Sequence, residues 1–118
     1  MSVKILIQRK VKVGKEKELN EAVRELRSKA IRAQGYISGE TLSSTEDPSI
    51  HLVISTWRGI EDWNRWADSP ERKAFQKKID AMLEVPTKVT SYQHEAIAPS
   101  TDEILAGLEV SVQMSSKS

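Results

Sequence analysis

Residues 50–83 read IHLVISTWRGIEDWNRWADSPERKAFQKKIDAML, and this stretch decides the fold. Its first eight residues carry apolar groups on both alternating faces, which is typical of a strand at the centre of a sheet. A short helix with two tryptophans follows, and Asp68-Ser69-Pro70-Glu71 then marks the start of another helix. Ser69 can accept a hydrogen bond from a first-turn amide, and Pro70 fits the first helical position. The stretch therefore predicts a strand, a short helix and an amphipathic helix in succession.

The flanking sequence supplies the remaining elements. Alternating apolar residues predict a strand over residues 3–13, and apolar residues at three- and four-residue spacing predict a helix over 15–33. Two further strands are expected at 36–44 and 87–97. The order β-α-β and then β-α-α-β predicts an α+β, ferredoxin-like fold with a four-stranded antiparallel sheet and its helices on one face.

One face of this predicted sheet has no helix to cover it. Burying apolar area is worth about 25 cal/mol per Å², so a large apolar face is expected to find a cover. The simplest cover is the same face of a second copy. The sequence therefore predicts a homodimer that associates through the sheet.

Composition excludes several classes of protein. The 118 residues are 38% hydrophobic and 30% charged, which suits a single domain, expected at residues 1–98. In the tail at 99–118, alternating apolar residues suggest a short extra strand, and the end is expected to be mobile. Without cysteine there is no thiolate metal site, and two histidines give no multi-histidine site. A net charge of +1 gives no general attraction to nucleic acid or membrane, and the basic run from Arg24 to Arg32 is expected to be a solvated helix face. No signal peptide or membrane-spanning run is recognisable, so a cytoplasmic protein is expected.

The chain resembles the antibiotic biosynthesis monooxygenase (ABM) domain in its central segment: a strand ending in Trp57-Arg58, then Trp63 and Trp66, then Ala67-Asp68-Ser69-Pro70-Glu71. The resemblance covers roughly residues 3–95. It implies a dimeric α/β barrel of ferredoxin-like subunits, with a reactive pocket between the sheet and the helices of each subunit. Family members include cofactor-free oxygenases of phenolic polyketides, haem-degrading monooxygenases, an isomerase of a small signalling sugar derivative and proteins without a known reaction. Fold alone therefore does not decide the function.

The haem-degrading branch of the family has an asparagine on the first strand, a tryptophan on the short helix and a histidine on the next helix. The matching positions in this chain are Gln8, Trp66 and Gln76. A glutamine amide is a poor substitute for the imidazole that ligates haem iron. We therefore expect neither haem nor another cofactor.

Four residues are candidates for the catalytic site. Trp66 could stack on a flat substrate, although a core or rim position fits the sequence equally well. Gln8 and Gln76 could bind a substrate carbonyl or hydroxyl, and both also fit a surface position. His51 is a weaker candidate as a general base, and a hydrogen-bonded strand residue fits the same pattern.

Substrate binding is assigned to Arg72 and Trp63. Arg72 could hold an anionic or phenolate oxygen, as could Arg9, although the helical pattern places Arg72 mostly outward and exposed arginines are commonly just solvated. Trp63 shares an apolar stripe with neighbouring residues and fits the core as well. Trp57, at the end of the central strand, is expected to be structural.

The leading hypothesis is a cofactor-independent monooxygenase that acts on a small aromatic or quinol-like substrate. The alternative is a non-catalytic or small-ligand-binding dimer on the same fold, and haem degradation ranks third. A narrow pocket filled by the protein's own side chains would favour the alternative. An open pocket with clustered polar groups would favour the enzyme.

Overall fold

The computed structural model describes residues 1–94, which form four strands and three helices. In chain order these are β1 (Val3–Lys10), α1 (Glu16–Ala30), β2 (Tyr36–Ser43), β3 (Ile50–Trp57), α2 (Ile60–Ala67), α3 (Pro70–Asp80) and β4 (Lys88–Gln93). The predicted tail strand, and the end of the strand predicted at 87–97, lie outside the described residues.

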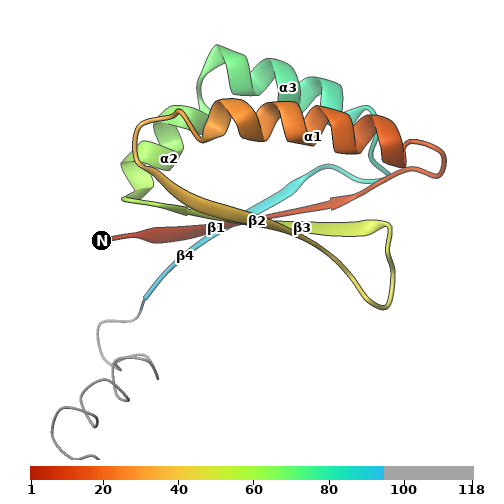
Figure 1. Ribbon diagram of the computed structural model, residues 1–118, viewed down its shortest axis with the longest axis horizontal. Helices are drawn as coiled ribbons and strands as arrows, with labels where there is room; N and C mark the ends of the chain where they lie inside the picture. The colour runs from red at the N-terminus through yellow and green to blue at the C-terminus, as the bar shows by residue number, and fades with distance from the viewer. Residues whose placement is uncertain (95–118) are drawn as a thin grey trace, which may run out of the picture.

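The four strands form one antiparallel sheet in the order β2-β3-β1-β4. Val3 of β1 lies opposite Trp57 of β3 on one side and Gln93 of β4 on the other. Helices α1 and α3 lie over one face of the sheet, and α2 lies at the end where β3 finishes (Figure 1). This is the α+β, ferredoxin-like fold that the sequence predicted, with β3 at an inner position.

Strand β1 shows how the core is filled. Its side chains alternate between the two faces, and Val3, Ile5 and Ile7 point toward the helices and are buried. Arg9 occupies the next position on this face and is buried as well. The apolar members of the face belong to one core cluster with side chains from the other elements, among them Leu19, Leu26, Trp57, Trp63, Trp66 and Ile79.

Strand β1 is shorter than predicted, because its pairing with β3 runs out. The pairing ends at Lys10, and Val11 then makes a single bridge to Leu83. Val13 is 91% exposed, and Gly14 turns the chain at a φ of +85°. The strand predicted to reach Val13 therefore ends at Lys10.

Helix α3 ends at Asp80, three residues before the end of the stretch 50–83 that predicted it. The residues after it bond to the end of β1: Lys12 N donates to Met82 O at 2.9 Å, and Glu84 N donates to Lys10 O at 2.8 Å. These backbone bonds replace the next helical turn. Helix α1 likewise stops at Ala30, before the predicted residue 33.

The opposite face of the sheet, which we call the open face, has no helix over it within residues 1–94 (Figure 1). It carries apolar side chains from all four strands: Leu6, Leu42, Leu52, Ile54 and Tyr92. The dimer predicted to bury this face stays a prediction. The helices of the described range are each too short or too polar to cross a membrane.

Candidate functional site

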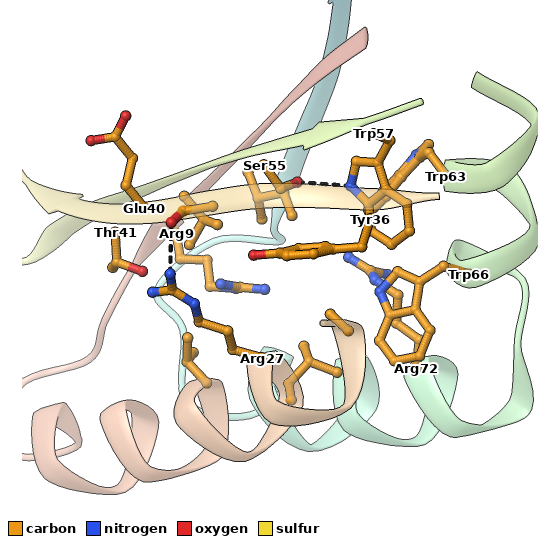
Figure 2. Close-up of a pocket in the computed structure, with 16 residues that line it drawn as sticks. Arg9, Arg27, Tyr36, Glu40, Thr41, Ser55, Trp57, Trp63, Trp66 and Arg72 are labelled. Carbon is orange, nitrogen blue, oxygen red and sulfur yellow. Dashed lines mark hydrogen bonds between the residues drawn. The ribbon is translucent and has the colours of Figure 1, made fainter. Parts of the chain in front are cut away.

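A cavity lies between the sheet and the helices, and we call its part beside the tryptophans the inner chamber (Figure 2). The inner chamber has a volume of about 60 Å³ and lies under the aromatic side chains of β2, β3 and α2. An outer chamber of about 230 Å³ adjoins it along α1. The two chambers share part of their lining: Arg9, Val23, Arg27, Thr41 and Val53. The result is a narrow, largely apolar space that continues into a wider one.

Aromatic rings from β2, β3 and α2 form the wall of the inner chamber. The Trp57 ring lies edge-on to Tyr36, with 5.3 Å between the ring centroids, and edge-on to Trp63 at 5.7 Å. Its indole nitrogen donates to Ser55 Oγ at 3.1 Å. Trp66, only 7% exposed, completes the wall from α2. Packing and this hydrogen bond fix the wall before any ligand binds.

The Tyr36 side chain lies across the inner chamber (Figure 2), and Gly39 leaves room for it. A Cβ atom on residue 39 would lie 2.6 Å from the Tyr36 hydroxyl oxygen, so any side chain there would force the Tyr36 ring to move. The Gly39 carbonyl oxygen accepts a hydrogen bond from Arg27 Nη2 at 2.6 Å. Position 39 therefore ties β2 to α1 as well as making room for the phenol.

Two arginines extend into the inner chamber, Arg9 from β1 and Arg72 from α3 (Figure 2). They are 3% and 6% exposed. Arg72 lies over the Trp63 ring, with 4.9 Å from the guanidinium carbon to the ring centroid. Arg9 Nε and Arg72 Nη2 are buried without a hydrogen-bond partner among residues 1–94, and neither arginine forms an ion pair within that range. Burying a charge without a partner is costly, so packing alone does not explain this pair.

The burial of these groups changes their acidity. Burial, followed by the charge of Arg72, lowers the pKa of Arg9 from 12.5 to about 10, and Asp80 acts in the opposite direction. Burial likewise lowers the pKa of Arg72, again opposed by Asp80. Asp80 forms no ion pair with either arginine, and its Oδ1 accepts from Gln76 Nε2 at 2.7 Å and from Thr87 Oγ1 at 2.8 Å. With a pKa of about 10, Arg9 stays charged at neutral pH and makes the chamber positive.

Ser69 fixes Trp66 and Arg72 relative to each other. Its hydroxyl donates to the Trp66 carbonyl oxygen at 2.7 Å and accepts from the Arg72 amide at 3.2 Å. Ser69 is the N-cap of α3 and Pro70 follows at the start of the helix, as the sequence predicted. The short connection between α2 and α3 thus brings a tryptophan and an arginine to the same cavity.

The structure brings together three of the residues that the sequence suggested: Trp63, Trp66 and Arg72 all line the inner chamber. The expectation that Arg72 faces mostly outward is wrong, because its side chain is buried and packs against the Trp63 ring. His51 is half-buried and lines the outer chamber only.

The two glutamines lie elsewhere. Gln8 is exposed on the open face, because the alternation of β1 gives that face to its even-numbered residues. Gln76 Nε2 donates to Asp80 Oδ1 at 2.7 Å and to Thr87 Oγ1 at 2.8 Å, and so ties α3 to the chain before β4. Neither glutamine lines the inner or the outer chamber, so the expected cluster of Gln8, Trp66 and Gln76 does not form within one chain.

Sequence reasoning did not single out Tyr36 and Ser55. It assigned Arg27 to a solvated face, and Arg27 is exposed while also bordering both chambers. Arg9 had a clear local signal, since the alternation of its strand places it inward between Ile7 and Val11. Tyr36 had no such signal, because its place depends on which strand β2 pairs with.

The fold and the cavity define the class of protein: a ferredoxin-like α+β domain with a cavity between its sheet and its helices. Residues 2–78 match the family model described as Antibiotic biosynthesis monooxygenase. This match covers more than half of the chain, so the chain belongs to the antibiotic biosynthesis monooxygenase family. No match to the chain was found among curated proteins.

Solved structures share the fold. A conserved protein from Methanosarcina mazei Go1 has a TM-score of 0.76 at 17% identity, over 80% of this chain and 94% of that one. Rv0793 from Mycobacterium tuberculosis has a TM-score of 0.74 at 13% identity, over 84% of this chain and 100% of that one. SnoaB, a cofactor-independent oxygenase from Streptomyces nogalater, has a TM-score of 0.72 at 13% identity, over 84% of this chain and 98% of that one. At these identities the likeness establishes the fold.

The side chains around the cavity do not fit a haem. The positions at which the haem-degrading branch has its asparagine and histidine carry Gln8 and Gln76, and both lie outside the two chambers. Among the described lining residues the sole histidine is His51, which borders the outer chamber.

Proposed function

We propose that this protein is a cofactor-independent monooxygenase that acts on a small aromatic or quinol-like substrate. One observation carries the proposal: the inner chamber combines an aromatic wall with two buried guanidinium groups in an otherwise apolar space. Membership of a monooxygenase-type family supports it. The likeness in fold to SnoaB, a cofactor-independent oxygenase, is consistent with it.

In such a reaction the substrate supplies the electrons. Deprotonation of a hydroxylated aromatic gives an anion whose ring carbon donates an electron to dioxygen. A carbon–oxygen bond then forms, and the resulting hydroperoxide loses water to leave a new carbonyl group. One oxygen atom enters the product and the other leaves as water, so no external reductant is required.

The residues of the chamber suit the demands of this chemistry. The apolar wall excludes bulk water, and Trp66 offers a ring face on which a flat substrate can stack. Arg72 and Arg9 stabilise the negative charge that develops on the substrate oxygen, which is the largest contribution a protein makes to many reactions of this kind. His51 is the candidate base, at the side of the outer chamber.

A second candidate is a protein that binds a small ligand without turnover. The volume of the inner chamber favours it, because ligand pockets typically enclose about 300–1,000 Å³ and this chamber encloses about 60 Å³. In the enzyme, the substrate therefore extends into the outer chamber.

Oxygen consumption tests the proposal directly. The purified protein is assayed with a panel of anthrones and naphthohydroquinones, and the product is analysed after turnover under isotopically labelled dioxygen. We expect uptake above the rate without protein and one labelled oxygen atom in the product. Trp66→Phe should lower kcat/KM by about tenfold, since it removes part of the stacking surface.

Tyr92→Phe is the matched control, because Tyr92 is exposed on the open face and far from the cavity lining. It should leave kcat/KM unchanged. If the unmodified protein consumes no oxygen with any member of the panel, the monooxygenase proposal fails and the ligand-binding candidate takes its place.

A further inference from the structure

We infer that Arg9 and Arg72 together bind a carboxylate, carried by a ligand whose remaining part is aromatic or otherwise apolar. The inference deepens the proposed function, on which it rests for the role of this ligand as a substrate. It names the substrate class: an organic acid in place of a neutral quinol. Four features of the described residues support it.

The first feature is the state of the two guanidinium groups. Buried arginines are normally paired, because an unpaired buried charge destabilises the folded protein. Arg9 Nε and Arg72 Nη2 are buried without a partner among residues 1–94, and both side chains end in the inner chamber. A carboxylate accepts two parallel hydrogen bonds from a guanidinium, so it supplies the acceptors that these donors lack.

The second feature is the engagement of nearby acids with other partners. Asp80 Oδ1 accepts from Gln76 and Thr87. Glu71 pairs with Lys29 at 3.3 Å. The Glu40 carboxylate points away from the inner chamber (Figure 2), although its residue contributes to the lining. Within the part of the chain that the structure describes, no carboxylate forms an ion pair with either arginine, although the charge of Asp80 is near enough to raise the pKa of both.

The third feature is the outer chamber, which has charge of the same sign. Its lining contains Arg24 and Arg27 in addition to Arg9, and no acidic side chain from residues 1–94. Arginines along one cleft attract anions and raise their local concentration. The space that adjoins the inner chamber thus favours a negatively charged ligand.

The fourth feature is the apolar character of the remaining wall, which selects among anions. Next to the arginines the inner chamber offers mainly Trp57, Trp66 and aliphatic side chains, and the hydroxyls of Ser55 and Tyr36 add further donors at two points of the lining. Inorganic phosphate or sulfate has oxygens on all sides, and some of these would be buried without donors. A carboxylate attached to an apolar ring places its oxygens at the arginines and its ring against the wall.

The experiment compares an anion with a neutral molecule of the same shape. Calorimetric titration of the full chain with 2-naphthoate and with 2-naphthamide, at neutral pH and one fixed salt concentration, gives the two dissociation constants. We expect 2-naphthoate to bind at least about tenfold more tightly, because only the carboxylate accepts charge-assisted hydrogen bonds from both guanidinium groups.

Variants then assign the effect to residues. Arg9→Met and Arg72→Met should each weaken 2-naphthoate binding by about tenfold or more and change 2-naphthamide binding by less than about threefold. Arg58→Met is the matched control, since Arg58 is exposed just after β3 and lines neither chamber. It should change neither dissociation constant.

Three outcomes would overturn the inference: equal affinity for the two naphthalene compounds, unchanged 2-naphthoate affinity in both methionine variants, or equally tight binding of inorganic phosphate. If one variant fails to fold, the comparison of 2-naphthoate with 2-naphthamide on the unmodified protein still decides the matter.

The binding experiment and the oxygen-uptake experiment test the two proposals independently. Selective 2-naphthoate binding without oxygen uptake on any substrate upholds the carboxylate site and removes the monooxygenase. Turnover of neutral quinols together with equal affinity for 2-naphthoate and 2-naphthamide upholds the monooxygenase and removes the carboxylate site.

Discussion

Arg9 stands at a strand position that the alternation of β1 assigns to the core, between Ile7 and Val11. Its burial lowers its pKa to about 10, so the folded protein holds this proton less tightly than the unfolded chain does. Because Arg9 is a base with a lowered pKa, the free-energy penalty of burying its charge is present at every pH below about 10. At neutral pH the folded state carries this penalty in full, which is expected of a residue placed for binding rather than for stability.

At the scale of this residue, we predict that Arg9→Met stabilises the ligand-free protein. Methionine keeps an apolar chain of similar length and removes the buried charge, so the free energy of unfolding at pH 7 should rise by about 1–3 kcal/mol. Urea denaturation measures the change, and the gain should shrink as the pH rises past 10, where the unmodified Arg9 loses its charge. Arg58→Met should stay within about 0.5 kcal/mol of the unmodified protein. A clear loss of stability in Arg9→Met would contradict the account of an uncompensated charge.

At the scale of elements, the connection between α2 and α3 positions the site. One hydroxyl, that of Ser69, bonds to the last turn of α2 through the Trp66 carbonyl and to the first turn of α3 through the Arg72 amide. The local sequence is sufficient for this arrangement, because the serine cap and Pro70 act within a few residues of each other. The helix start was therefore predictable, whereas the buried direction of Arg72 was not.

We predict that Ser69→Ala lowers the free energy of unfolding by about 1 kcal/mol, since the first turn of α3 loses its side-chain acceptor. Ser28→Ala is the matched control, because the Ser28 hydroxyl bonds to the Glu25 carbonyl on the exposed side of α1. That change should cost less than about 0.5 kcal/mol. Thermal or urea unfolding of the two variants gives the comparison, and equal losses would show that the cap contributes nothing specific.

Element boundaries show where local pattern stops being informative. The alternation in the sequence continues to Val13, yet β1 ends at Lys10 because its pairing with β3 ends there. Helix α3 ends at Asp80 because Met82 and Glu84 bond to the end of β1. In both cases the boundary depends on hydrogen bonds with a segment that is distant in sequence. The residues next to the boundary therefore do not predict it.

At the scale of the whole molecule, the two faces of the sheet differ in what covers them. The helix-covered face holds the core and the cavity, whereas the open face exposes Leu42 and Tyr92 and carries Leu6, Leu52 and Ile54 beside them. Apolar area of this kind is stabilised when it is buried, at about 25 cal/mol per Å². A second copy of the same face remains the cover that we expect.

We predict that the protein sediments at twice the mass of one chain at micromolar concentration. Ile54→Glu places a charge near the middle of the open face and should yield single folded chains, as judged by sedimentation and circular dichroism. Val13→Glu is the control, because Val13 is exposed outside the sheet, and it should leave the mass unchanged. A single-chain mass for the unmodified protein would exclude the dimer.

The sequence by itself determined the order of the elements, the ferredoxin-like arrangement, the start of α3 and the family. These features follow from local periodicity, capping and turn residues, which act over a few positions along the chain. Only the tertiary structure decided that Arg9 and Arg72 line the same cavity as Trp63 and Trp66, and that Gln8 lies on the other face. The reason is that strand pairing and helix packing bring together residues that are far apart in sequence, and those contacts are made by the fold as a whole.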